Sequence, residues 1–173
     1  MTADTGYPLI HKTKKEQKTM EIKLADLDYP PFVRLIEEHT KDMYEDVPEE
    51  YDTAINMENL PDENVTFWSV FDGDQLAGCG ALKELGATHG EIKSIKTHPD
   101  HLQKGVASLL MDFLTQEAQR RGYTRLSLET GTTDDFIPAR ALYEKLGFTY
   151  CESYLDGPAD PESVFMTKVL DPL

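Results

Sequence analysis

The sequence predicts one α/β domain, built as a mixed and mostly antiparallel β-sheet flanked by helices. Three observations support this prediction. The 173 residues suit a single domain with one core. Segments whose apolar residues repeat with the period of a strand alternate along the chain with segments whose apolar residues repeat with the period of a helix. One amphipathic helix joins two strand-like segments as a crossover, whereas other strands follow one another through short turns.

The domain is expected to span residues 19–173, after a polar tail at residues 1–18. The tail contains four lysines and no apolar periodicity, which is typical of a mobile extension. Hydrophobic residues make up 39% of the chain and charged residues 28%, so a fully disordered chain is excluded. No apolar run reaches the roughly 18 residues of a membrane helix, and the start lacks the apolar core of a secretory signal. We therefore expect a cytoplasmic protein that does not bind membranes.

The net charge of −15 argues against nucleic acid as a partner, because binding to phosphates requires a basic surface. The negative charge is concentrated in the N-terminal half. Between Asp26 and Asp74 there are 15 acidic residues and only two basic ones, Arg34 and Lys41. Such a region either attracts a cationic amine or serves only as a solubilising surface.

The first elements are a strand, a helix and a hairpin. A short strand is predicted at 21–24 and a helix at 31–43, where apolar residues recur with helical spacing. Residues 65–71 are rich in β-branched and aromatic types and end at the turn signal Asp72-Gly73-Asp74. A strand resumes at 75–85, so the two segments form a β-hairpin.

The middle of the chain contains the clearest helix. A third strand is predicted at 91–97 and stops at His98-Pro99. The helix follows at 105–121, ends at Gly122 and leads into the next strand at 125–129. Its apolar residues fall on one face: Val106, Leu109, Leu110, Phe113, Leu114 and Ala118.

The last third of the chain adds one helix and two strands. The helix is predicted to start near Asp134-Asp135, with Pro138 in its first turn, and to end at Gly147. Residues 148–153 and 163–169 are expected to form a closing pair of strands around a loop rich in proline and aspartate.

The segment from Thr97 to Ala107 joins a strand to the start of the long helix. Unpaired amide groups and the positive end of the helix dipole converge there, an arrangement that binds phosphate groups. Gly105 and Ala107 would let a pyrophosphate approach the backbone. Without other signals, a glycine at a helix start also fits an ordinary turn.

Residues 104–107 read Lys-Gly-Val-Ala, and residues 139–148 read Ala-Arg-Ala-Leu-Tyr-Glu-Lys-Leu-Gly-Phe. With these two motifs the sequence resembles the GNAT acetyltransferases. The coenzyme loop of that family reads Q/R-x-x-G-x-G/A, and a later helix reads N-x-x-A-x-x-L-Y-x-x-x-G-F. The resemblance covers roughly residues 20–170. Leu102 replaces the first Gln or Arg, and Phe136 replaces the Asn.

The resemblance implies the GNAT fold, in which two parallel strands splay apart at the acetyl-CoA site. It also implies acetyl-CoA as a cosubstrate and no metal. In the family, the backbone before the loop pairs with the pantetheine arm and the loop holds the pyrophosphate. The positions that the resemblance assigns to the coenzyme are Ile95, Lys96, Thr97, Leu102, Gln103, Lys104, Gly105, Val106, Ala107, Ser108, Phe136, Ala139 and Arg140.

Transfer of an acetyl group to an amine requires a base for the ammonium and an acid for the departing thiolate. By resemblance, Glu91 is the candidate base and Tyr143 the candidate acid. Glu91 could instead be a solvent-facing carboxylate at a strand edge, and Tyr143 an amphipathic core residue. Glu129 ends the neighbouring strand and is the rival base.

The histidines and cysteines show no metal-binding pattern. His89, His98 and His101 lack the spacing of metal ligands and are expected to be exposed loop residues. Cys79 and Cys151 lie in strand-like stretches and are expected to be reduced, buried, small apolar side chains.

The expected function is transfer of an acetyl group from acetyl-CoA to the primary amine of a small molecule, amino acid or peptide. Neither motif contains a cysteine, which favours direct transfer in a ternary complex over an acyl-enzyme. A homodimer is compatible with the sequence. The alternative is a non-catalytic module that uses the same fold to bind acyl-CoA and regulate a partner.

Overall fold

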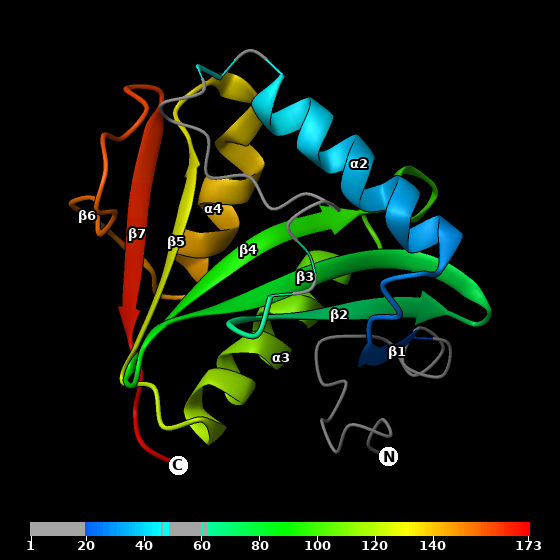
Figure 1. The fold of residues 1–173 in the computed structure, drawn as a ribbon, viewed down its shortest axis with the longest axis horizontal. Helices are drawn as coiled ribbons and strands as arrows, with labels where there is room; N and C mark the ends of the chain where they lie inside the picture. The colour runs from blue at the N-terminus through cyan, green and yellow to red at the C-terminus, as the bar shows by residue number, and fades with distance from the viewer. Residues whose placement is uncertain (1–19, 46, 49–59, 61) are drawn as a thin grey trace.

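The computed structural model describes residues 20–45, 47–48, 60 and 62–173. Their strands form one seven-stranded sheet in the order β1-β2-β3-β4-β5-β7-β6 (Figure 1). The strands are β1 (Met20–Leu24), β2 (Val65–Asp72), β3 (Gln75–Gly86), β4 (His89–Thr97), β5 (Arg125–Gly131), β6 (Thr149–Cys151) and β7 (Ser163–Val169). The helices are α2 (Pro30–Tyr44), α3 (Val106–Arg120) and α4 (Ile137–Lys145), with short 3₁₀ helices η2 (Pro99–His101) and η3 (Asp134–Phe136). The expected tail at 1–18 lies outside the described residues.

The predicted mixed sheet is confirmed. Strands β1 to β4 form an antiparallel meander, and β5, β7 and β6 are also paired antiparallel. The pair β4 and β5 is parallel, and α3 forms the crossover between them. Parallel neighbours need such a crossover because the chain must return to the same end of the sheet.

Helices α3 and α4 cover one face of the sheet. All six residues of the predicted apolar stripe on α3 are buried. They pack in the main core with Ile92 of β4 and with Leu126 and Leu128 of β5. Leu142 and Tyr143 of α4 join the border of the same core.

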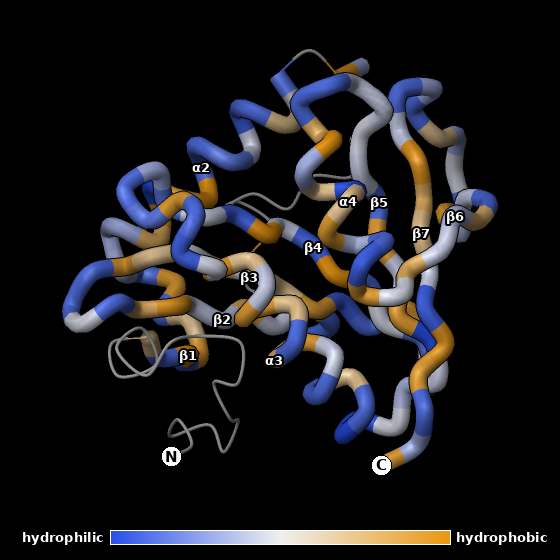
Figure 2. The backbone as a smooth tube through the Cα atoms, turned by 180° about the vertical axis from the view of Figure 1, so that it is seen from behind, coloured by the Kyte–Doolittle hydropathy of each residue, from blue (hydrophilic) through white to orange (hydrophobic). Residues whose placement is uncertain are grey.

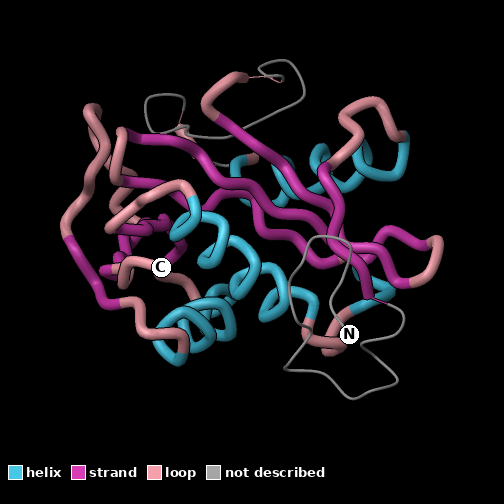
Figure 3. Tube along the Cα trace, turned by 90° about the horizontal axis from the view of Figure 1, so that it is seen from below, coloured by secondary structure: helices cyan, strands magenta, loops and turns pink. Residues whose placement is uncertain are grey.

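Helix α2 covers the opposite face, over β2 and β3. Phe32, Leu35 and Ile36 are fully buried, and the ring of Phe32 meets that of Phe67 edge-on at 5.5 Å. In Figure 2 the tube of α2 changes between hydrophilic and hydrophobic segments, as expected of a helix with one apolar face. Figure 3 shows helices on both sides of the strands.

Strand β4 leaves β5 part-way along its length, because it contains a bulge. Between two paired positions, β4 advances by three residues, from Lys93 to Lys96, whereas β3 advances by two, from Ala81 to Cys79. Ser94, inside the longer stretch, has a positive φ of 56°. A bulge bends its strand and changes its direction. The pairing of β4 with β5 accordingly runs from His89 to Ile92 and goes no further. This is the predicted splay.

Three predicted boundaries need correction. The strand expected at 91–97 begins at His89 and includes Gly90, although glycine is unfavourable inside a strand. A Cβ atom at Gly90 would lie 2.7 Å from the ring of Tyr123, so glycine makes room for that ring. The helix expected from Asp134 to Gly147 is divided into η3 and α4. The strand expected at 148–153 is only three residues long.

Candidate active site

A cavity of about 120 Å³ opens where β4 and β5 part. Its walls come from the bulged part of β4, the end of β5, helix α4 and the last turns of α2. The predicted residues Glu91, Ile95, Phe136, Ala139 and Tyr143 line it. Residues that lie far apart in the sequence, from Glu91 to Tyr143, therefore surround one opening between two strands.

The end of β4 has one paired edge and one edge that has left its neighbour. Thr97 and Lys96 pair with Gly78 and Cys79 of β3. Toward β5, the last paired residue is Ile92. Backbone groups beyond that point need other partners, and the amides of an extended ligand would suit them. The side chain of Lys96 does not face this edge, because its Nζ pairs with Asp42 of α2 at 3.1 Å.

The loop between η2 and α3 has an irregular backbone. Gln103 and the helix N-cap Gly105 have φ values of 62° and 79°, in the left-handed region. No side chain caps the helix, so the amides of its first turn, at Val106, Ala107 and Ser108, remain available. Leu102 is 61% exposed, so the residue that replaces the family's Gln or Arg projects into solvent.

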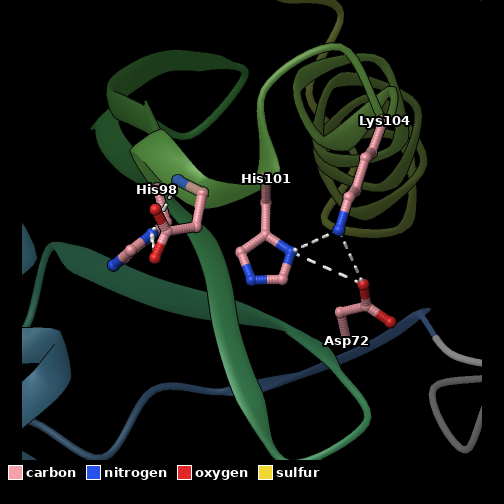
Figure 4. Close-up of polar contacts among 5 residues, drawn as sticks. Asp72, His98, His101 and Lys104 are labelled. Carbon is pink, nitrogen blue, oxygen red and sulfur yellow. Dashed lines mark hydrogen bonds and ion pairs between the residues drawn. The ribbon is translucent and has the colours of Figure 1, made fainter.

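Lys104 lies in the middle of this loop, and its ammonium group points back toward the end of β2. Its Nζ lies 3.4 Å from Oδ2 of Asp72 and 3.3 Å from Nδ1 of His101 (Figure 4). His101 is itself 3.4 Å from the same Asp72 oxygen. These contacts connect the loop with the β2–β3 hairpin.

Helix α4 brings the second motif to the other side of the splay. Phe136 packs on Gly131, where a Cβ atom would come within 2.3 Å of the ring. Arg140 donates hydrogen bonds to the backbone carbonyls of Gly131 at 2.5 Å and Thr133 at 3.2 Å. Its guanidinium group thus stabilises the turn between β5 and η3, a role that the sequence did not predict.

Tyr143 is a residue of α4 whose side chain lines the cavity. Its ring meets Phe148 edge-on at 6.2 Å, and burial raises the pKa of its phenol to about 12. The phenol therefore keeps its proton at neutral pH, as a general acid must.

Glu91 is not a carboxylate at a solvent-facing strand edge, since it is only 2% exposed. Both of its oxygens have partners. The hydroxyl of Tyr154 donates to Oε2 at 2.5 Å, and Nζ of Lys93 lies 3.5 Å from Oε1. Glu129, two residues before the end of β5, lines the same cavity and also a second one beside it.

The sequence model of the acetyltransferase (GNAT) family matches residues 32–148. The chain belongs to the GNAT acetyltransferase family. It is 52% identical to the uncharacterized N-acetyltransferase YsnE of Bacillus subtilis, over 87% of this chain and 100% of that protein. It is 45% identical to the uncharacterized N-acetyltransferase YedL of Escherichia coli, over 86% of this chain and 94% of that protein.

Solved structures agree in fold. A GNAT family acetyltransferase from Elizabethkingia anophelis, solved with acetyl-CoA bound, has a TM-score of 0.66 to this chain at 16% identity. The match covers 88% of this chain and 99% of the other. The family and the two named relatives identify this protein as an acetyltransferase.

Two histidines of this acetyltransferase differ from the prediction. His101 is buried at 3% exposure, and His89 lies in β4, where its Nε2 and Ser127 Oγ are 2.7 Å apart. Burial is the main cause that lowers the pKa of His89. His98 is on the loop as expected, and its Nδ1 accepts a hydrogen bond from the amide of Asp100. The short segments around His89 and His101 show no apolar periodicity, so the burial of these side chains could not be predicted from the sequence.

Three residues around the acetyltransferase cavity were missed in the sequence. His39 of α2 lines the cavity, and burial, with a smaller effect of Lys96, lowers its pKa to about 4. Lys93 is two residues from Glu91, and residues with that spacing lie on the same face of a strand. The pair of opposite charges was therefore a signal that the sequence offered. Tyr154 had no signal, since it comes from the irregular segment after β6.

Within the described residues, no group of His, Cys, Asp or Glu side chains could hold a metal ion. No helix in that part of the chain is long and apolar enough to span a membrane.

Proposed function

We propose that this acetyltransferase transfers an acetyl group from acetyl-CoA directly to the primary amine of a small molecule, amino acid or peptide. The splay of β4 and β5 is the observation that carries the proposal. It opens beside the α4 phenol on one face of the sheet and beside two carboxylates on the other. Donor and acceptor can therefore meet in one opening from opposite sides.

The coenzyme would lie along the end of β4 and over the start of α3. Backbone groups of Ile95, Lys96 and Thr97 would bind the amides of the pantetheine arm. The pyrophosphate would sit on the loop from Leu102 to Ser108, where the amides of the first turn and the dipole of α3 favour an anion. Ala139 and Phe136 would pack beside the arm.

The reaction needs three proton transfers. The acceptor ammonium gives a proton to Glu91, with Glu129 as the rival base, and the free amine attacks the thioester carbonyl carbon to form the C–N bond of a tetrahedral intermediate. The C–S bond then breaks, and the phenol of Tyr143 donates its proton to the departing sulfur. The nitrogen loses its second proton, which restores the phenol of Tyr143. Amide groups at the β4 bulge are suited to stabilise the oxyanion of the tetrahedral intermediate.

Transfer through a cysteine has little support in this fold. Cys79 is fully buried under α2, and burial raises the pKa of its thiol to about 12. Cys151 lies at the sheet edge in β6, and burial also raises its pKa. Neither residue lines the cavity, whereas a nucleophilic thiol is accessible and has a lowered pKa.

Two measurements test the proposal. Acetyl-CoA should raise the melting temperature, since a ligand that binds the folded state stabilises it. Release of free thiol should then depend on an added primary amine, measured over a panel of amino acids, simple amines and short peptides. Thiol release at the same rate with and without every amine would contradict an N-acetyltransferase, whereas no thermal shift at millimolar coenzyme would contradict the coenzyme site.

A further inference from the structure

A buried ammonium group lies beside the splay. The side chain of Lys93 is 7% exposed, and the residue lines the cavity. Among the described residues, its only polar side-chain contact is with Glu91, at 3.5 Å. An ammonium group carries three N–H donors, and a buried charge is costly unless its donors are bonded. Lys93 therefore has the capacity to bind an anionic group in the cavity.

Glu91 does not saturate this ammonium group. A charge-assisted hydrogen bond measures about 2.7–2.9 Å, so a separation of 3.5 Å is a looser contact. The tighter bond of Glu91 is the one from Tyr154, at 2.5 Å. Glu91 thus keeps Lys93 in place from one side and leaves its other donors for a ligand.

A carboxylate faces Lys93 across the splay. Glu91 pairs in register with Ser127, and Ile92 with Leu128 is the last pair. Lys93 and Glu129 come one residue further on their strands, and both side chains share the face of Glu91 and Ser127. Neighbouring strands are roughly 4.8 Å apart where they pair and diverge beyond that point. The opening therefore has the ammonium group of Lys93 on its β4 side and the carboxylate of Glu129 on its β5 side.

We propose that the acceptor is a free amino acid or a close analogue, with a carboxylate on the carbon that bears the amine or on the next one. The carboxylate would bind Lys93, and the amine would lie between Glu129 and Glu91, next to the thioester. A purely cationic amine would instead bring its charge close to the ammonium of Lys93. This inference rests on the proposed function and narrows its substrate class.

The test compares acceptors that differ only in the carboxylate. Glycine, leucine and phenylalanine are each paired with the amino alcohol in which a hydroxymethyl group replaces the carboxylate. In the wild-type enzyme, kcat/KM should be roughly 10- to 100-fold higher for the amino acid, as expected when a charged hydrogen bond is lost. Lys93→Met should abolish this preference, and Lys93→Arg should largely restore it. If Lys93→Met only disturbed packing, kcat/KM would fall equally for the amino acid and for its amino alcohol, and the preference would remain.

Lys23→Met is the matched control. Lys23 also lies 3.5 Å from a glutamate, Glu21, but its side chain is 55% exposed on the edge strand β1. This variant should keep the wild-type preference. Equal use of amino acids and amino alcohols by the wild-type enzyme, or acetylation of carboxylate-free amines alone, would overturn the inference while leaving N-acetyltransfer intact. If no amine at all is acetylated, the proposed function itself fails.

Discussion

The hydroxyl of Tyr154 donates a 2.5 Å hydrogen bond to Oε2 of Glu91, which lies 63 positions earlier in the chain. Burial, and then the negative charge of Glu91, raise the pKa of Tyr154. The phenol is thus a permanent donor, and it holds the carboxylate in one orientation at the cavity.

Tyr154→Phe should lower the free energy of unfolding by about 1.5–3 kcal/mol, because it removes a hydrogen bond to a buried charged group. Urea denaturation measures this change. Tyr150→Phe is the control, since Tyr150 donates to Glu144 at 3.0 Å on the exposed surface. It should leave the free energy of unfolding almost unchanged, because water replaces a hydrogen bond on the exposed surface. Equal effects of the two variants would contradict a structural role for the Tyr154 bond.

Glu91→Gln should lower kcat/KM most strongly near pH 7, where the acceptor arrives as an ammonium. The deficit should shrink as the pH approaches the pKa of the acceptor, because solution then supplies the free amine. Glu129→Gln in the same assay decides between the two carboxylates. If only Glu129→Gln shows a deficit that high pH rescues, Glu129 is the base.

Tyr143→Phe should reduce turnover by about 10²- to 10⁴-fold, because the ring remains and only the proton donor is lost. Affinity for acetyl-CoA, measured by calorimetry, should stay within a few-fold of the wild type. A turnover rate equal to that of the wild type would make Tyr143 a packing residue of α4.

Gly105→Glu should abolish the thermal shift caused by acetyl-CoA, because it places an anion where the pyrophosphate is expected. Gly122→Glu is the matched control at the other end of α3. Gly122 also has a positive φ, 83°, so both variants carry the same backbone strain and the same charge. Loss of the shift in both variants would show that strain, and not the anion, is responsible.

His39 should make stability depend on pH between about 4 and 6.5. Its folded-state pKa of about 4 lies below the usual 6.5, so the unfolded chain binds a proton in this range that the folded chain does not. The contribution of neutral His39 to the free energy of unfolding is fully present above pH 6.5 and is lost as the pH falls toward 4. Between pH 7 and pH 5 the loss should be roughly 1–2 kcal/mol, and His39→Gln should remove that share. An identical pH dependence in the variant would contradict the assignment.

Much of the fold was predictable, because its signals lie close together in the sequence. The apolar stripe from Val106 to Ala118 determined the buried face of α3, since residues three and four apart share one side of a helix. The hairpin at Asp72-Gly73-Asp74 and the order of strands and helices followed in the same way. Gly105 at the start of α3 also indicated a phosphate-binding loop.

Only the tertiary structure decided how polar side chains meet at the splay. Lys93 lines one cavity with His39 of α2, and Tyr154 reaches Glu91 from the irregular segment after β6. Arg140 also binds the β5–η3 turn, a contact that its motif did not indicate. Periodicity records how residues sit on their own helix or strand. The partner of a polar group instead depends on which distant elements pack together, and no local pattern contains that information.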